Sequence, residues 1–203
     1  MPYRHALGDI VYHVFNRATP GVRLFDVARD YVAFEQVLAE AHDQVPMRTI
    51  AYCIMPNHWH FVLWPNQDEH LSRFMHWLTM THAKRWRGFH KTVGAGHVYQ
   101  WRFRGFPVES DGHFLTVCRY VERNALRAGL VTRAEEWRWC SLYLRMFADA
   151  KARSLLSDGP IPLPGDWAAE VNVPQTGAEV EALRKCLARG RPFGGEHWVL
   201  RVA

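Results

Sequence analysis

Apolar residues recur along the chain with two periods, and these periods predict the order of its strands and helices. The segment DIVYHVFNRA (9–18) alternates apolar and polar side chains, which is typical of a half-buried strand. The run VARDYVAFEQVLAEAHDQ (27–44) has apolar residues at helical spacing, and Asp26 is placed to cap it. A strand and then an amphipathic helix are therefore expected at the start of the chain.

A β-hairpin is predicted next. The segments MRTIAYCIM (47–55) and HWHFVLW (58–64) are rich in β-branched, aromatic and other apolar residues. Only Pro56 and Asn57, both turn formers, separate them. We expect two central strands joined by a tight turn.

The remaining periodic segments complete an α+β pattern. They predict a second helix, a fourth strand and a third helix that Gly129 closes, in LSRFMHWLTMTHAKRWRGFH (71–90), VYQWRFRGFPVE (98–109) and HFLTVCRYVERNALRA (113–128). The order β-α-β-β-α-β-α favours an antiparallel sheet with helices packed on one face, of the ferredoxin-like or RRM-like type.

The composition changes near residue 149. Residues 149–176 are rich in Pro, Gly, Ser and Asp and predict a linker that wraps the surface. A short helix near 179–189 and the basic tail RGRPFGGEHWVLRVA follow. We expect a main domain of residues 1–148 and a C-terminal part, 149–203, made of linker, short helix and tail.

Charge and composition narrow the class of protein. The chain of 203 residues has a net charge of +5, no apolar run of membrane-spanning length and four scattered cysteines, and these features predict a soluble cytoplasmic protein with reduced thiols. Its arginines stand beside aromatic residues, a mixture suited to phosphate pairing and base stacking. The candidate nucleic-acid contacts are Arg85, Arg87, Trp101, Arg102 and Arg104 in these patches, and Arg127 further along the chain.

Two histidines stand one residue apart in the predicted strand 58–64. Residues at i and i+2 of a strand point to the same face about 6.6 Å apart, so His58 and His60 can reach one metal ion. Trp59 and Phe61 then face the opposite side. On spacing alone, two partly buried core histidines in an aromatic strand are an equally good interpretation.

The third predicted helix offers further polar groups, in RYVERNALRAGL. Tyr120 and Asn124 are four residues apart and share a helix face, and Arg127 follows one turn later on the same side. Taken singly, they are typical of a half-buried tyrosine, an exposed amide and a solvated charge. Together with a metal ion, they form the residue set of a phosphotransfer site with a tyrosine nucleophile.

These segments resemble a known family. MPNHWHFVLW and RYVERNALRAGLV are similar to the HUH single-tyrosine transposases of the REP-associated kind, and YHVFNRA, GHVYQWRFRGFPV and RGRPFGGEHWV extend the resemblance over nearly the whole chain. The resemblance implies that His58, His60 and Asn124 bind a divalent ion, Mg²⁺ or Mn²⁺. It also implies that Tyr120 is the nucleophile. Ala18, Trp101 and Ala125 depart from the pattern expected of the family. None of them belongs to the implied catalytic set, which is complete.

The resemblance further implies a reaction and a partner. The expected function is cleavage and rejoining of a single-stranded, hairpin-forming REP-type DNA through a 5′-phosphotyrosine, by a nucleoid-associated enzyme. A monomer is preferred over a dimer. Two other functions fit the residues: a non-catalytic RRM-like nucleic-acid-binding protein, and a metal-dependent phosphodiesterase that uses water.

Overall fold

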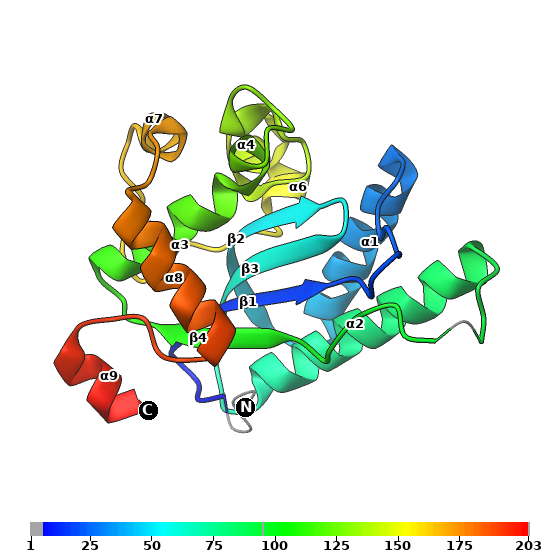
Figure 1. The fold of residues 1–203 in the computed structure, drawn as a ribbon, viewed down its shortest axis with the longest axis horizontal. Coiled ribbons are helices and arrows are strands. Elements are labelled where there is room, and N and C mark those ends of the chain that lie inside the picture. Colours follow the sequence, from blue (N-terminus) through cyan, green and yellow to red (C-terminus); the bar gives the residue numbers. More distant parts are fainter. Residues whose placement is uncertain (1–5, 95, 203) are drawn as a thin grey trace.

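Four antiparallel strands form the centre of the molecule (Figure 1). The computed structural model describes residues 6–94 and 96–202. The strands lie in the order β2-β3-β1-β4, which is the ferredoxin-like order expected from the sequence. Their bounds are Val11–Arg17 for β1, Met47–Met55 for β2, His58–Pro65 for β3 and Arg104–Val108 for β4. The predicted hairpin is confirmed, since Met55 pairs with His58 across the two-residue turn.

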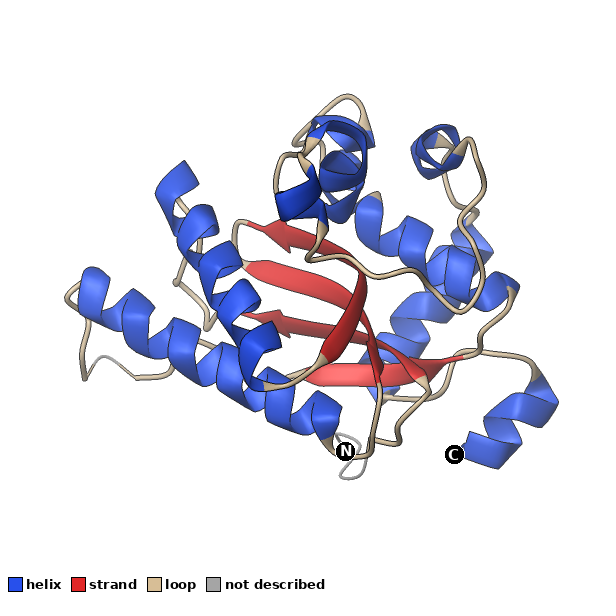
Figure 2. Cartoon of the chain, turned by 180° about the vertical axis from the view of Figure 1, so that it is seen from behind, coloured by secondary structure: helices blue, strands red, loops and turns tan. Residues whose placement is uncertain are grey.

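One face of the sheet is covered by the two long helices, α1 (Ala28–Gln44) and α2 (His70–Phe89). Figure 2 shows both helices in front of the strands when the molecule is seen from behind. The sheet residues packed toward them are apolar and include Trp59, Phe61 and Leu63. These three residues alternate with the histidines of β3, as the period of a strand requires.

The third helix lies on the opposite face, so the prediction that helices cover only one face was wrong. Val62 of β3 and Phe106 of β4 pack toward α3 (Gly112–Glu122) in a second hydrophobic cluster. β2 and β3 are almost entirely buried, and strands that are apolar on both sides need cover on both. The shorter helices of this layer are α4 (Asn124–Arg127), η1 (Ala134–Glu136), α5 (Ser141–Phe147), α7 (Trp167–Asn172) and α8 (Gly177–Arg189).

The helix predicted over 113–128 is broken at Arg123 into α3 and α4. The Asp111 side chain caps α3 by accepting a hydrogen bond from the His113 backbone N–H, and Gly129, at φ +70°, closes α4 as expected. Asp26 does not cap α1. Instead, the carboxylate of Asp30 accepts the backbone N–H groups at the start of that helix.

Residues after 148 pack on the same side of the sheet as α3. Trp167, Val171 and Leu183 are buried in the same cluster as Phe106. The backbone of Phe193 bonds to Pro107 and Glu109, which adds a short parallel bridge beside β4. α6 (Ala150–Arg153) and α9 (Glu196–Val202) complete the helices. The boundary at residue 148 stays a prediction, and the C-terminal part shares its core with the rest.

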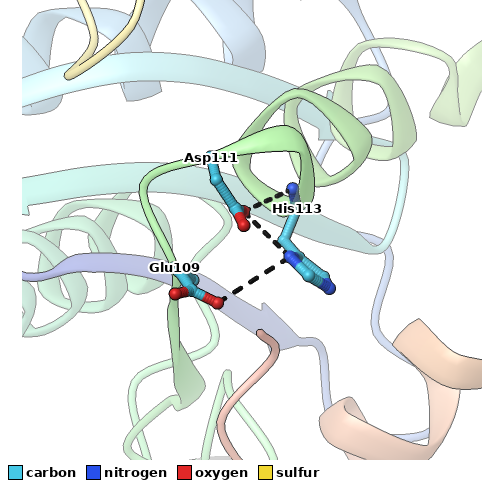
Figure 3. A group of neighbouring side chains, drawn as sticks. All are labelled: Glu109, Asp111 and His113. Atoms are coloured by element: carbon cyan, nitrogen blue, oxygen red, sulfur yellow. Dashed lines mark hydrogen bonds and ion pairs between the residues drawn. The ribbon is translucent and has the colours of Figure 1, made fainter. Parts of the chain in front are cut away.

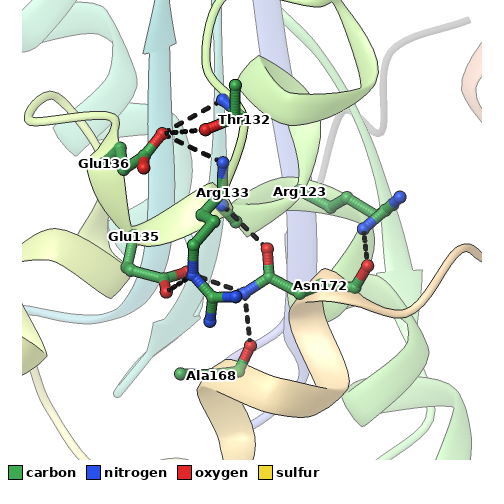
Figure 4. Close-up of polar contacts among 8 residues, drawn as sticks. Arg123, Thr132, Arg133, Glu135, Glu136, Ala168 and Asn172 are labelled. Carbon is green, nitrogen blue, oxygen red and sulfur yellow. Dashed lines mark hydrogen bonds and ion pairs between the residues drawn. The ribbon is translucent and has the colours of Figure 1, made fainter.

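A polar network fastens this C-terminal part to the break between α3 and α4 (Figure 4). The Arg123 guanidinium donates to the backbone carbonyls of Val171 and Asn172. The Asn172 side chain bonds in turn to the backbone N–H of Ala134 and to the Glu135 carboxylate. Arg123 therefore connects the end of α3 to α7.

The four cysteines are free thiols, as the sequence predicts. Among the described residues, no helix is both long and apolar enough to span a bilayer.

Candidate functional site

His58 and His60 leave β3 on the face of the sheet that carries α3. Their ring centroids are 5.2 Å apart and the rings are nearly perpendicular. His60 is buried, with 5% of its surface exposed, while His58 lies at the rim. The alternation of the strand thus holds both imidazoles beside each other, which is the placement that the i, i+2 spacing predicts.

A third histidine, His13 of β1, joins this pair and was not singled out in the sequence. Its Nε2 lies 3.0 Å from Nδ1 of His60, and the two ring planes are nearly parallel. His13 is fully buried. His13 comes close to His60 because β1 pairs with β3 in a register that sets Phe15 opposite His60. This register joins segments that are distant in the sequence, so the pattern of β1 alone does not predict it.

Tyr120 reaches the histidines from α3. Its ring meets His60 and His13 edge-on, at centroid distances of 5.9 and 6.1 Å. The tyrosine is 5% exposed, so the helix packs its ring against the sheet. The predicted nucleophile and the predicted metal ligand His60 are therefore neighbours.

Arg127 and Asn124 complete the cluster from α4. The Arg127 guanidinium carbon lies 4.1 Å from the centre of the Tyr120 ring, and its Nη2 donates to Asn124 Oδ1 at 2.9 Å. Asn124 is 3% exposed, and its Nδ2 has no hydrogen-bond partner among the described residues.

The histidines of the cluster are neutral at pH 7. Burial, with the charges of Arg17 and Arg127 added, lowers the pKa of His58 to about 4. Burial and then the charge of Arg127 lower the pKa of His13 to about 3. The pKa of His60 is lowered well below its usual value, mainly by burial and then by the two neighbouring histidines. Neutral imidazole is the form that binds metal ions.

The ring nitrogens of His58 are also arranged for a ligand. Nδ1 of His58 lies 2.7 Å from Asn57 Oδ1, and an amide oxygen only accepts, so Nδ1 carries the proton in this pair. Nε2 then has a free lone pair. Two neutral imidazoles and one amide oxygen are donors that suit a divalent ion with open positions, so His58, His60 and Asn124 fit the implied metal.

A second group of potential ligands lies at the turn from β4 to α3 (Figure 3). Ligand atoms of Glu109, Asp111 and His113 are within 4.8 Å of one another. Each carboxylate already has a structural bond, because Asp111 caps α3 and Glu109 accepts the Gly195 backbone N–H at 2.6 Å. These contacts connect the turn to the C-terminal segment before α9.

The basic residues predicted to contact DNA differ in the partners that they already have. Arg85 makes a bidentate ion pair with Glu40 of α1, at 2.7 Å for each bond. The Arg104 guanidinium lies 4.1 Å above the ring of Trp101, which is 44% exposed. Arg104 has the same strand parity as Phe106, and it therefore points to the face that carries the histidines.

Residues 101–103 separate two hollows and are not part of a strand, contrary to the prediction. Asn16 donates to the carbonyls of Trp101 and Arg102, and these bonds take the place of a β-ladder. A cavity of about 740 Å³ on the α2 side includes Lys84 and Arg87 in its lining, and no acidic residue. A cavity of about 330 Å³ on the other side is lined in part by Arg104 and Arg189. Trp101, Arg102 and Phe103 border both.

Comparison with known proteins identifies the class. The model of the IS200-like transposases matches residues 7–124, which is more than half of the chain and includes His58, His60, Tyr120 and Asn124. The chain belongs to this family. No curated protein matches the sequence.

A solved structure gives a finer comparison. It is the structure of a REP-associated tyrosine transposase bound to a REP hairpin. Its sequence is 17% identical, the match covers 82% of this chain and 92% of that chain, and the TM-score is 0.54. At this identity, the likeness shows the fold alone.

Proposed function

We propose that the protein is a metal-dependent, single-stranded DNA endonuclease and strand transferase, with Tyr120 as its nucleophile. The observation that carries this proposal is the position of the Tyr120 ring, which stands edge-on to His60 with the Arg127 guanidinium against it. Family membership supports the same class of activity. A structural tyrosine would not need a cation, two buried imidazoles and an incompletely bonded amide around it.

The proposed ligands of the metal ion, Mg²⁺ or Mn²⁺, are His58, His60 and Asn124. When bound, the ion would polarise the scissile phosphate and hold it beside the nucleophile. Asn124 Oδ1 has two lone pairs, so it can accept from Arg127 and still offer one to a ligand. Arg127 thereby links the metal-binding amide to the face of the nucleophile's ring.

The reaction is a transesterification. The phenol oxygen of Tyr120 attacks phosphorus in line, a bond from that oxygen to phosphorus forms, and the bond from phosphorus to the 3′ oxygen breaks. The proton lost from the phenol is balanced by the proton that the departing 3′ oxygen takes up. The products are a 5′-phosphotyrosine and a free 3′-hydroxyl, and attack by a 3′-hydroxyl reverses the step and rejoins DNA.

The proposed DNA partner is a hairpin with a single-stranded segment, as in the REP hairpin that the similar transposase binds. Arg104 on the site face and Arg87 and Arg102 along the larger cavity would pair with phosphates, and the exposed ring of Trp101 would stack on a base. This path leads from the histidines over residues 101–103 to the α2 side. We propose action as a monomer at chromosomal DNA.

The test is a covalent adduct. The protein is incubated with a labelled hairpin DNA carrying single-stranded flanks and Mn²⁺, then denatured and separated on a gel. We expect a labelled protein band that Tyr120→Phe abolishes. Tyr143→Phe, which changes a partly buried tyrosine of α5 outside the site, is the matched control and should retain the band.

Two outcomes would favour the other functions. Cleaved DNA without an adduct, unchanged in Tyr120→Phe, would indicate hydrolysis by water. Binding with neither cleavage nor adduct would indicate a nucleic-acid-binding protein with structural histidines.

A further inference from the structure

The two histidines proposed as metal ligands have different partners at Nδ1. His58 uses an exposed amide oxygen, that of Asn57, at 2.7 Å. His60 uses another imidazole, that of His13, at 3.0 Å. A metal-binding histidine ordinarily donates its second ring N–H to an oxygen, and that bond fixes both its tautomer and its orientation. An imidazole in this place is unusual, because it can be either a donor or an acceptor.

The geometry makes His13 a partner of His60 rather than a further ligand. The ring centroids are 5.1 Å apart, the nitrogens are 3.0 Å apart and the planes differ by 10°, so the two nitrogens point at each other. An ion between them would lie about 1.5 Å from each, whereas bonds from a divalent ion to imidazole are about 2.0–2.1 Å. A single proton occupies the space.

Whether His13 or His60 carries that proton decides whether His60 can bind metal through Nε2. If His13 donates, neutral His60 must carry its own proton on Nε2, where a metal would bind. If His60 donates from Nδ1, its Nε2 has a free lone pair. His13 is fully buried beside Phe15 and Phe106, and its own Nδ1 has no hydrogen-bond partner among the described residues. Nδ1 of His13 therefore lacks a partner in either tautomer, as a bare lone pair if His13 donates and as an N–H if it accepts, and a metal ion bound at His60 Nε2 would select the tautomer in which His13 accepts.

We propose that His13 is a positioning residue that accepts the Nδ1 proton of His60 and thereby keeps His60 Nε2 free for the metal ion. This inference rests on the proposed function insofar as His60 is a metal ligand. It assigns to β1, which carries neither the nucleophile nor a proposed ligand, control over the proton on the buried ligand. Asn57 serves His58 in the same way from the turn between β2 and β3.

The test compares two substitutions of His13 and measures Mn²⁺ affinity without DNA, by electron paramagnetic resonance. His13→Leu removes the acceptor and should weaken Mn²⁺ binding about 10- to 100-fold. His13→Gln supplies an amide oxygen near the position of Nε2 and should restore most of the affinity. The thermal midpoint of each variant shows whether it is folded.

A matched control separates this role from packing. His82 is another buried histidine with one side-chain hydrogen bond, to Tyr99, and it lies on the opposite face of the sheet. His82→Leu should lower the thermal midpoint and leave Mn²⁺ affinity unchanged. Folded His13→Leu that binds Mn²⁺ as tightly as the wild type would overturn the proposal.

A spectroscopic measurement tests the tautomer directly. Ring ¹⁵N shifts of the Mg²⁺-loaded protein should show the proton on Nδ1 of His60 and a lone pair on Nε2 of His13. The reverse assignment would overturn the inference. If wild-type protein binds Mn²⁺ through His58 and His60 but forms no adduct with DNA, the proposed function fails and the role of His13 stands. Wild-type protein that binds no Mn²⁺ would overturn both.

Discussion

The two faces of the sheet each hold buried histidine, and the difference between them separates a structural role from the chemical role that we propose. On the face that α1 and α2 cover, His82 forms a hydrogen bond with the Tyr99 hydroxyl at 2.6 Å, and Trp59 donates to the same oxygen. On the α3 face, His13, His58 and His60 converge beside a tyrosine and an arginine.

Burial alone does not distinguish these two groups. Burial lowers the pKa of His82 to about 3, as it does for His13. The two groups differ in how many polar side chains converge and in how many of their buried polar atoms lack a hydrogen-bond partner. Asn124 Nδ2 and His13 Nδ1 have no hydrogen-bond partner among the described residues. The Tyr99 hydroxyl, in contrast, forms hydrogen bonds with both His82 and Trp59. Convergence with unfilled bonds marks the site.

The largest expected effect comes from removing one histidine on each face. His60→Ala should reduce DNA cleavage to about one-thousandth or less, because it removes a proposed ligand of the ion that we propose polarises the phosphate. His82→Ala should leave the cleavage rate of folded protein unchanged and lower the free energy of unfolding by about 2–4 kcal/mol. Single-turnover cleavage and urea unfolding measure the two quantities. Equal loss of cleavage in both variants would remove the distinction between the faces.

The next effect concerns the cation of the site. Arg127→Met keeps much of the side-chain bulk but removes the charge beside Tyr120, and cleavage should fall about 100-fold with hairpin affinity changed little. Arg138→Met is the matched control, since Arg138 also lies over an aromatic ring, that of Trp139, outside the site. A similar loss of cleavage in both variants would mean that arginine stacking, not charge at the nucleophile, sets the rate.

A smaller effect is expected in the dependence of stability on pH. The folded-state pKa of His82 is about 3 against an ordinary value of 6.5, so the unfolded chain takes up this proton first as the pH falls. The contribution of His82 to stability is therefore complete above pH 6.5 and is lost as the pH falls toward 3. His82→Gln should reduce the slope of unfolding free energy between pH 6 and 4 by about 1.4 kcal/mol per pH unit. An unchanged slope would show that His82 titrates normally in the folded protein.

The smallest expected effect compares two arginines of one helix. Arg87 lies along the larger cavity, whereas Arg85 is paired with Glu40. Arg87→Ala should weaken hairpin binding about 3- to 10-fold and reduce its salt dependence by about one phosphate contact. Arg85→Ala should change neither. Fluorescence anisotropy over a series of salt concentrations measures both, and a greater loss in Arg85→Ala would place the DNA on the α1 side.

Local patterns predicted much of this molecule. The alternation in HWHFVLW predicts that His58 and His60 share a face, because a strand has a fixed period of two residues. Gly129 marks the end of the helical segment with the tyrosine, because a C-cap depends on neighbouring residues. These signals need no knowledge of distant parts of the chain.

The remainder depends on contacts between distant segments. His13 meets His60 only through the register of β1 against β3, and Arg85 meets Glu40 only through the packing of two helices. The strand predicted over 98–109 is shortened because Asn16, more than eighty residues away, takes the carbonyls of Trp101 and Arg102. Period and composition do not specify such partners.

Glu122 has a consequence for how the protein can be divided. This carboxylate lies two residues after Tyr120, is fully buried, and accepts hydrogen bonds from Ser141 and from Trp167 in the C-terminal part. Burial raises its pKa, against the opposing influence of Arg145. A fragment that ends at residue 148 would lose Trp167 and expose the carboxylate and its helix to water. Inactivity of such a fragment would therefore report displacement of the proposed nucleophile, and a DNA-binding role for the C-terminal part is better tested by point substitutions in the full chain.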